Sequence, residues 1–359
     1  MNRFVPIALG GVLFAACGAP EAKEVPTNTS LETITGFYHP EDLEVLPGGN
    51  LLLVSEYGGL NGERPTVLSV IDLESKRRGV LFPKDGAVAP GNAGDVWGSA
   101  DCPGAPPEIA PHGIHMGRRK SGEDQLLVVN HRGREAIEFF ELTGKASGDP
   151  GLVWRGCVVA PDTEVWFNDV AALPGNGFAV THMMPHGAQE ELLQRAEGDR
   201  AKTGYVLQWL PSAGWSKVPR SEGAINNGIQ ASDDGATLYV AHFLGDQVVA
   251  IERETGDELW VAEMSSPDNL SFAPDGRLLV ASIRASLAQV RECSETDAPV
   301  CSLDFAVVSV DPSSGATETL LEGGSEDFGA ATVAVEAGNR LVMGSFSGDR
   351  IAVTALPKP

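Results

Sequence analysis

Six copies of one strand–turn–strand pattern predict an all-β fold, a six-bladed β-propeller built around a central channel. In the clearest copy, Asn168 and Asp169 precede an apolar run, a turn follows at residues 174–177, and a second apolar run ends at Val180. This order indicates two antiparallel strands joined by a tight turn. The copies begin at residues 41, 112, 168, 227, 268 and 331. Intervals of 41 to 71 residues between them suit one four-stranded blade per copy.

The start and the end of the domain are expected to share the last blade. Residues 31–37 alternate between polar and apolar as a strand does, and the sixth copy supplies only three apolar runs, near Val333, near Leu341 and at 351–353. A four-stranded blade needs one strand more. We therefore expect an N-terminal strand to complete the sixth blade and close the ring, which removes exposed sheet edges.

Two long interruptions separate the predicted strands. Residues 84–111 are rich in Gly, Pro and Ala and predict a long loop without a strand. Residues 185–203 contain a segment of high helix propensity at 190–196. Because this segment leaves the second strand of the third blade, it forms either a lid over the channel mouth or an ordinary surface loop.

The first 30 residues predict export and lipid anchoring. Residues 1–17 combine Arg3, an apolar run and a lipobox ending at Cys17, in which Phe14 stands where Leu is usual. We expect Cys17 to carry a lipid that anchors the protein to the membrane of a bacterial cell envelope, facing the periplasm or the surface. A plain signal peptide with an incidental Cys is the alternative. Residues 18–30 would be a tether and 31–359 the propeller, while the membrane leaflet and the oligomeric state stay open.

The charge of the chain excludes some classes of partner. A net charge of −23 and a pI near 4.6 argue against binding to nucleic acid or to anionic membrane surfaces. An acidic shell of this kind tolerates calcium. The 42 Gly and 24 Pro among 359 residues fit an all-β domain with many turns.

The cysteines indicate disulfides. Four of the five remain once Cys17 is set aside, and an oxidising compartment allows two bonds with three connectivities. Cys293 and Cys301 flank a short polar loop, and Cys102 and Cys157 each precede a blade start, so that neighbouring blades could bring them together. We favour these two pairs. Thiolate coordination of a metal is the alternative, although the chain has no CxxC spacing.

The blade starts carry an unusual set of polar residues. The first strand of each blade of a propeller lines the central channel, so equivalent strand starts meet at one end of it. Five of the six starts bring Glu, Asp, Asn or His to that end. Buried carboxylates and amides need partners. A calcium ion, which takes six to eight oxygen ligands, is the partner that this set predicts.

The ordered set of these motifs resembles the paraoxonase/arylesterase family, part of a wider group of calcium-dependent six-bladed propellers that includes gluconolactonases. The resemblance covers about residues 36 to 355, and no single motif would be specific. The matching segments are residues 39–47, 111–114, 126–131, 168–170, 227–229 and 268–270.

The resemblance implies two calcium ions in the channel, one catalytic and one structural. The structural ion would take Asp42, Asp169 and the backbone carbonyl of Ile114. The catalytic ion would take five side chains, those of Glu41, Asn168, Asn227, Asp268 and Asn269. Alternation along a strand points neighbouring residues in different directions, which is consistent with each adjacent pair serving both ions.

The resemblance also implies a histidine dyad formed by His112 and His131. Two departures concern the chain ends: the animal enzymes keep an N-terminal helix where this chain has a lipobox, and no cysteine lies near the C-terminus to join the two ends. The loops around the mouth differ in composition too. Substrate preference is therefore the property that transfers least.

These observations, together with the resemblance, predict a calcium-dependent hydrolase of lactones and aryl esters. Calcium would polarise the carbonyl, and His112 with His131 would remove a proton from the attacking water. Asp268 and Glu41 are competing candidates for the base. No GxSxG motif indicates a serine nucleophile. The alternatives are a sugar lactonase or phosphotriesterase on the same site, and a non-catalytic, lipid-anchored binding propeller that keeps calcium for stability.

Overall fold

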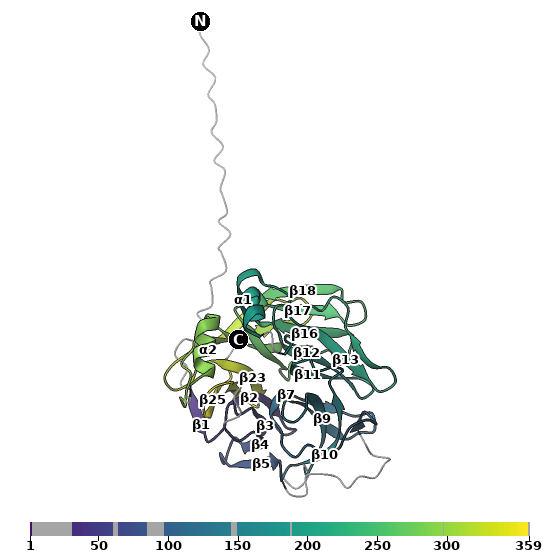
Figure 1. Cartoon of the computed structure of the whole chain (residues 1–359). Coiled ribbons are helices and arrows are strands. Elements are labelled where there is room, and N and C mark those ends of the chain that lie inside the picture. Colours follow the sequence, from purple (N-terminus) through teal and green to yellow (C-terminus); the bar gives the residue numbers. More distant parts are fainter. Residues whose placement is uncertain are drawn as a thin grey trace.

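Six small sheets form a ring, which confirms the predicted six-bladed propeller (Figure 1). The computed structural model describes residue 1 and residues 31–59, 64–84, 97–144, 149–186, 189–296 and 298–357. The first strands of neighbouring blades contact one another around the whole ring and surround the channel. These first strands are β2 (Pro40–Val45), β7 (Pro111–Arg118), β11 (Phe167–Leu173), β15 (Asn226–Ala231), β19 (Pro267–Phe272) and β23 (Ala331–Ala337).

In each blade, the strands that follow the first strand along the chain lie successively farther outward. The first three blades add β3 (Leu51–Glu56), β4 (Val67–Asp72), β5 (Arg78–Phe82), β8 (Asp124–Asn130), β9 (Ala136–Thr143), β10 (Gly151–Val159), β12 (Gly177–His182), β13 (Tyr205–Leu210) and β14 (Gly214–Lys217). The other three blades add β16 (Thr237–His242), β17 (Gln247–Glu252), β18 (Glu258–Glu263), β20 (Leu278–Ile283), β21 (Phe305–Val310), β22 (Thr317–Gly323), β24 (Arg340–Ser345) and β25 (Arg350–Ala355).

The ring closes through the N-terminal strand β1 (Glu32–Thr35), as the sequence predicts. β1 pairs antiparallel with β25, with Ile34 opposite Ile351, and it becomes the outermost strand of the sixth blade. This closure joins the two ends of the described domain without a disulfide between them. The predicted signal peptide and tether lie outside the described residues apart from residue 1, and no helix within the described ranges is long and apolar enough to cross a membrane.

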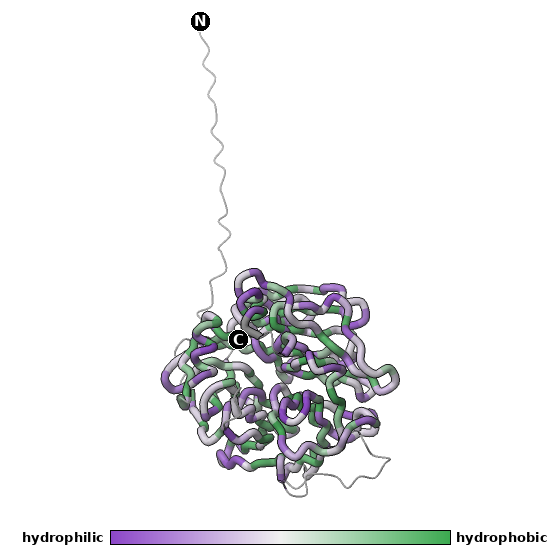
Figure 2. Tube along the Cα trace, viewed as in Figure 1, coloured by the Kyte–Doolittle hydropathy of each residue, from purple (hydrophilic) through white to green (hydrophobic). Residues whose placement is uncertain are grey.

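The hydrophobic core lies between the blades. Apolar residues follow the strands while polar residues occupy the turns (Figure 2). Each of six buried clusters combines side chains from two neighbouring blades; one, for example, packs Leu53 and Leu68 of the first blade against Leu126 and Phe140 of the second. Because every blade buries both faces against its neighbours, the ring holds the channel walls rigidly.

Two short elements differ from the sequence prediction. The stretch 84–111 contains a two-residue strand, β6 (Trp97–Gly98), which pairs in parallel with β10 and makes the second sheet five-stranded. The expectation of a loop without a strand is therefore wrong at this point. Strand β6 forms because a glycine at 156, on β10, allows the backbone of Trp97 to approach closely: a Cβ there would lie 1.9 Å from the Trp97 carbonyl oxygen. Helix α2 (Leu287–Ser294), between β20 and β21, was not predicted.

Other predictions are confirmed. The helical segment in 185–203 is α1 (Gln189–Asp199), between β12 and β13. The disulfides are the two expected pairs, Cys102–Cys157 and Cys293–Cys301. The first of these pairs lies within the second blade, because Cys102 follows β6 and Cys157 is on β10; it does not join neighbouring blades.

Candidate active site in the central channel

Every first strand is irregular at its first residues, where the predicted site residues lie. The pairing with the second strand shifts register between Pro40 and Asp42 in β2, and between Phe167 and Val170 in β11. Equivalent shifts occur at the starts of β7, β15, β19 and β23. A bulge releases residues from the sheet ladder and re-aims their side chains. Six bulges at one level of the channel therefore turn the polar residues of several blades toward a common point.

Hydroxyl groups hold the bulged backbones in place. Ser55 donates to the carbonyl oxygen of His112 at 2.6 Å, and Thr181 donates to that of Asn227, also at 2.6 Å. Thr332 donates to the carbonyl oxygen of Glu41 at 2.7 Å. Each bond runs from one blade to a site residue of the next, so the positions of the site residues depend on the contacts between blades.

Glycine at 113 allows two of the first strands to meet. A Cβ on Gly113 would lie 2.3 Å from Oδ1 of Asp169 and 2.5 Å from its Cα. The same is true in the fourth blade, where a Cβ on Gly228 would lie 2.5 Å from the carbonyl oxygen of Asp268. Side chains at these positions would push the neighbouring strand, with its candidate ligands, away from the channel axis.

The structure brings the predicted metal ligands together in the buried channel. Their exposed fractions run from 1% to 7%. Glu41, Asn168, Asn227 and Asp268 line one cavity together with His112. Asn269 reaches the same group, because its Nδ2 donates to Oε1 of Glu41 at 2.7 Å.

Four buried oxygen atoms in this group accept no hydrogen bond from any described residue. They are Oε2 of Glu41, Oδ1 of Asn168, Oδ1 of Asn227 and Oδ1 of Asn269. Buried oxygens of this kind are rare in native proteins and require an explanation. Carboxylate and amide oxygens are the ligands that calcium takes in proteins, and so the donor chemistry of the group fits a hard cation.

Asp42 and Asp169 make a second, repeated arrangement. Asp42 accepts the backbone N–H groups of Leu43 and Ile114, at 2.8 and 2.7 Å. Asp169 accepts those of Val170 and Ile229, both at 2.7 Å. Each carboxylate thus links the first strands of two neighbouring blades. Ile114 contacts Asp42 through its amide, and coordination of a metal by its carbonyl stays a prediction.

The buried carboxylates are electrostatically unfavourable without a cation. Burial raises the pKa of Glu41 well above its usual value, and Asp42 and Asp268 raise it further. Burial also raises the pKa values of Asp169 and Asp268 well above normal and that of Asp42 to about 7. Within the described ranges, no three His, Cys, Asp or Glu side chains are grouped so as to hold a metal on their own. A metal ion in the channel would therefore also need the side-chain oxygens of the asparagines as ligands.

The predicted histidine dyad forms a hydrogen-bonded chain with a third residue. Nδ1 of His112 lies 2.9 Å from Nε2 of His131, and Nδ1 of His131 lies 2.9 Å from Oε2 of Glu135. Oε1 of Glu135 accepts the backbone N–H of Phe167 at 2.6 Å. Nε2 of His112 lies on the side of Glu41, 3.8 Å from its Oε1. The chain therefore runs from the cavity to the start of the third blade.

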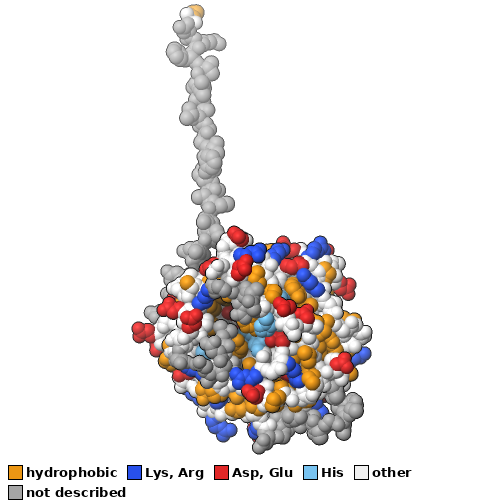
Figure 3. Space-filling model, in the orientation of Figure 1, with side chains coloured by type: hydrophobic (Ala, Val, Ile, Leu, Met, Phe, Trp, Pro, Cys, Tyr) orange, Lys and Arg blue, Asp and Glu red, His pale blue; other side chains and the backbone are white. Residues whose placement is uncertain are grey.

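Aromatic rings support this chain. Tyr57 stacks on His112 with ring centroids 4.8 Å apart, and Trp166 meets His131 edge-on at 6.3 Å. His186, whose side chain is 44% exposed, stacks on Trp166, and its Nε2 lies 4.0 Å from Oε2 of Glu135. Histidine side chains gather near the centre of the face shown in Figure 3.

The cavity above the polar group is mostly apolar. Its volume is about 230 Å³. Helix α1 contributes Leu193, and α2 contributes Leu287 and Val290. Of the two alternatives for residues 185–203, this contact favours a lid over the channel mouth. The other apolar lining residues are Trp166, Met183, Met184, Ile225, Phe243, Ile283 and Phe346. A ligand would thus meet a polar floor and apolar walls.

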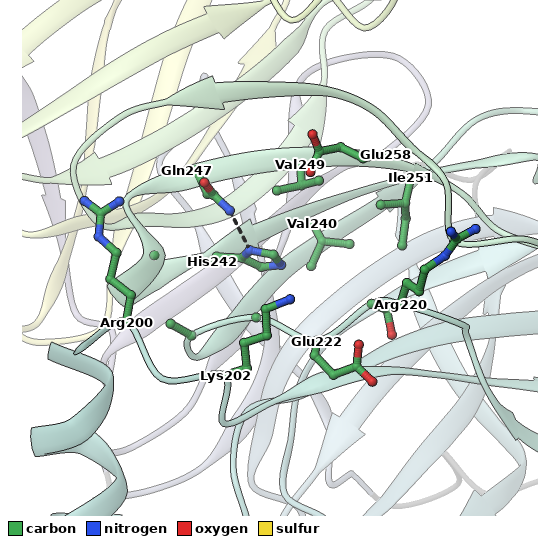
Figure 4. A pocket seen from close by; sticks show the side chains of 15 residues that line it. Arg200, Lys202, Arg220, Glu222, Val240, His242, Gln247, Val249, Ile251 and Glu258 are labelled. Carbon is green, nitrogen blue, oxygen red and sulfur yellow. Dashed lines mark hydrogen bonds between the residues drawn. The ribbon is translucent and has the colours of Figure 1, made fainter. Parts of the chain in front are cut away.

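A second cavity, between the third and fourth blades, is a weaker candidate. Its volume is about 160 Å³, and Arg200, Lys202, Arg220 and the buried His242 line it (Figure 4). Arg200 pairs with Asp246 at 3.1 Å and Arg220 pairs with Asp257. Nδ1 of His242 accepts the amide of Gln247. Because Arg200, Arg220 and His242 already have partners within the protein, we place the site in the channel.

Solved structures of several enzymes share the architecture. A putative gluconolactonase is 13% identical with a TM-score of 0.53, over 92% of this chain and 93% of that chain. A luciferin-regenerating enzyme is 12% identical with a TM-score of 0.53, over 92% and 96%. A gluconolactonase from Xanthomonas campestris is 16% identical with a TM-score of 0.52, over 91% and 89%. These identities establish a common propeller fold and nothing further.

Neither a protein-family model nor a curated protein sequence matches the chain. The resemblance to the paraoxonase/arylesterase family therefore stays a prediction.

Sequence reasoning missed some site residues. Glu135 lies in the turn between β8 and β9 and belongs to no repeated motif. Helix α2 was detectable, because Ser286 and Gln289 form a capping box at its start. Tyr57 and Trp166 carry no signal of their own in the sequence, because only the ring of blades brings them to the dyad.

Proposed function

We propose that the protein is a calcium-dependent hydrolase of lactones and aryl esters. The observation that carries this proposal is the set of four buried carboxylate and amide oxygens without a hydrogen-bond partner among the described residues, next to a histidine at the floor of an apolar cavity. The names of two structural neighbours, a gluconolactonase and a putative gluconolactonase, support a lactone as the substrate.

Two ions fit the donor groups of the channel. Glu41, Asn168, Asn227, Asp268 and Asn269 would hold the catalytic one, since all but Asp268 offer an oxygen without a partner in the described structure. A bound calcium ion supplies Lewis-acid polarisation of a carbonyl oxygen and stabilises the negative charge that develops on it.

Asp42, Asp169 and the carbonyl of Ile114 would hold the structural ion. Both carboxylates keep lone pairs beyond the two N–H groups that each accepts. Each also joins two first strands, so an ion bound there would reinforce the contacts that hold the channel together.

His112 is the proposed general base. Burial and the neighbouring His131 lower the pKa of His112 well below its ordinary value, so the ring is neutral and can accept a proton. Nε2 takes a proton from water as the water oxygen bonds to the carbonyl carbon. When the ester C–O bond breaks, the leaving oxygen takes that proton from Nε2.

The apolar walls favour substrates with alkyl or aryl substituents. Trp166, Met183, Phe243 and Phe346 offer contact area but few hydrogen-bond partners for hydroxyl groups. A sugar lactonase, the activity named for two neighbours, is the second candidate function. No feature of the site favours a phosphotriester over either kind of ester.

A panel of lactones and phenyl esters tests the proposal. The calcium-loaded protein is expected to hydrolyse alkyl lactones and phenyl esters faster than gluconolactone, and excess chelator should abolish both reactions. Preference for gluconolactone would favour the sugar lactonase. If the calcium-loaded protein hydrolyses no ester, and the chelator lowers only its melting temperature, the non-catalytic, lipid-anchored binding propeller is the better description.

A further inference from the structure

The carboxylate of Glu135 determines where the protons of both histidines lie. An ionised carboxylate only accepts hydrogen bonds, so His131 must donate from Nδ1 across the 2.9 Å contact to Oε2. A neutral imidazole carries one proton, which leaves Nε2 of His131 as an acceptor. His112 must then donate from Nδ1 across the other 2.9 Å contact. The lone pair of His112 consequently lies on Nε2, on the side of the cavity.

The position of Glu135 is itself determined by the fold. The turn between β8 and β9 brings residue 135 back to His131, four residues earlier. The other oxygen, Oε1, accepts the N–H of Phe167, which directly precedes the candidate ligand Asn168. The side chain of Glu135 is only 13% exposed. One carboxylate thus fixes the histidine chain relative to the strand that carries a metal ligand.

We propose that Glu135 is a positioning residue that holds His131 and His112 in the tautomers that make Nε2 of His112 a base. The proposal rests on the proposed hydrolase function for its kinetic consequence. Glu135 is not one of the residues that line the cavity, and it takes up no proton in the proposed reaction. It orients His131, and its negative charge stabilises the positive charge that the pair carries after His112 is protonated.

Glu135→Gln tests this proposal. The N–H of Phe167 requires an oxygen at 2.6 Å, so the glutamine amide should turn its NH2 group toward His131. His131 would then accept at Nδ1 and donate from Nε2, and His112 would carry its proton on Nε2, facing the cavity. We expect kcat for a lactone to fall roughly a hundred- to ten-thousand-fold, with KM and calcium affinity nearly unchanged. Glu135→Asp, which keeps a carboxylate, should recover part of this loss.

The control is Glu164→Gln, the same substitution at an exposed glutamate three positions before Phe167, which should leave kcat unchanged. Nitrogen-15 NMR of the imidazole rings gives a readout independent of turnover. We expect both histidines of the wild-type protein to be protonated at Nδ1, and both to change to Nε2 in Glu135→Gln.

The outcomes separate the inference from the function. If the wild-type protein hydrolyses lactones and Glu135→Gln keeps its kcat, the role of Glu135 is overturned and the proposed function stands. If no lactone is hydrolysed but the NMR pattern is as expected, the hydrolase function fails and the tautomer assignment stands. A wild-type His112 with its proton on Nε2 overturns the assignment even if the variants fail to fold.

Discussion

Nδ2 of Asn269 donates to Oε1 of Glu41 at 2.7 Å, although 228 positions separate the two residues along the chain. Asn269 lies on β19 in the fifth blade and Glu41 on β2 in the first, so the bond crosses the channel region without using the sheet ladders. Oε2 of Glu41 and Oδ1 of Asn269, the atoms that this bond does not use, have no partner in the described structure. The bond orients two oxygens, and the fold leaves both available to a cation.

Removal of calcium should lower the stability of the protein. Because the candidate ligands come from several blades, an ion bound to them stabilises the folded ring and not the unfolded chain. At a calcium concentration about 100 times the Kd, this stabilisation is about 2.7 kcal/mol. Calorimetry should show a lower melting temperature in excess chelator, together with the loss of turnover. Full activity and an unchanged melting curve in chelator would rule out the calcium site.

The stability of the metal-free protein should fall as the pH rises from 6.5 to 8. Burial raises the pKa of Glu44 to about 8 and that of Asp42 to about 7. In the unfolded chain these carboxyl groups lose their protons near the ordinary pKa, whereas in the folded protein they keep them up to the raised pKa. Their contribution to the stability of the fold is therefore full below the ordinary pKa and is lost as the pH rises through the raised pKa. Burial lowers the pKa values of His115, His182 and His242 to about 4, and since unfolded histidines titrate at about 6.5, their opposite effect on stability acts mainly below this window.

Melting temperatures in chelator at pH 6.5 and pH 8 measure this effect. Glu44→Gln should flatten the dependence, because the amide oxygen can still accept the N–H of Met116 but carries no titrating proton. In the presence of calcium the melting temperature should instead rise with pH, since calcium binding displaces the protons from the carboxyl groups. A metal-free protein that is as stable at pH 8 as at pH 6.5 would contradict the raised pKa values.

Lipid attachment at Cys17 predicts that the protein fractionates with membranes. The lipoprotein modification supplies several acyl chains, enough for stable anchoring. Cys17→Ser should leave an unprocessed precursor or release a soluble form, which immunoblotting of cell fractions would detect. Recovery of the wild-type protein only in the soluble fraction would show that Cys17 is not an anchor.

The sequence predicted the parts of the molecule that repeat. The repeated strand–turn–strand pattern located all six first strands, because the same geometry recurs in each blade. Strand β6 was not predicted, because two paired residues in a stretch rich in Gly and Pro produce no periodicity in the sequence. The role of Glu135 depends on the N–H of Phe167 from the next blade, a contact that no local pattern contains. The resemblance placed the candidate ligands at the starts of the repeats, whereas the hydrogen bonds behind the proposed base follow only from the packing of the blades.

The final prediction distinguishes ligands from the base. Asn168→Ala and Asp268→Ala each remove an oxygen donor from the channel, so calcium affinity and hydrolysis should weaken together. His112 offers no oxygen, and on the proposed mechanism it only accepts and returns a proton. His112→Gln should therefore keep calcium affinity and melting temperature nearly intact while turnover falls roughly a hundred- to ten-thousand-fold. Calcium titration calorimetry and lactone kinetics on the same preparations measure both quantities.

In His112→Gln, turnover of phenyl esters should fall as much as turnover of lactones. The reason is that the attack of water needs the base, whatever the leaving group. If this variant keeps wild-type turnover, the base is a carboxylate, and Asp268 is the first candidate.

If His112→Gln instead loses calcium, His112 is part of the structure that holds the ligands. Two contacts would explain such a loss: the carbonyl oxygen of His112 accepts a hydrogen bond from the hydroxyl of Ser55, and Tyr57 stacks on the imidazole ring. Ser55→Ala is the matched control: it removes the backbone bond and leaves the imidazole, so any calcium loss that it shares with His112→Gln comes from the displaced strand and not from the missing base.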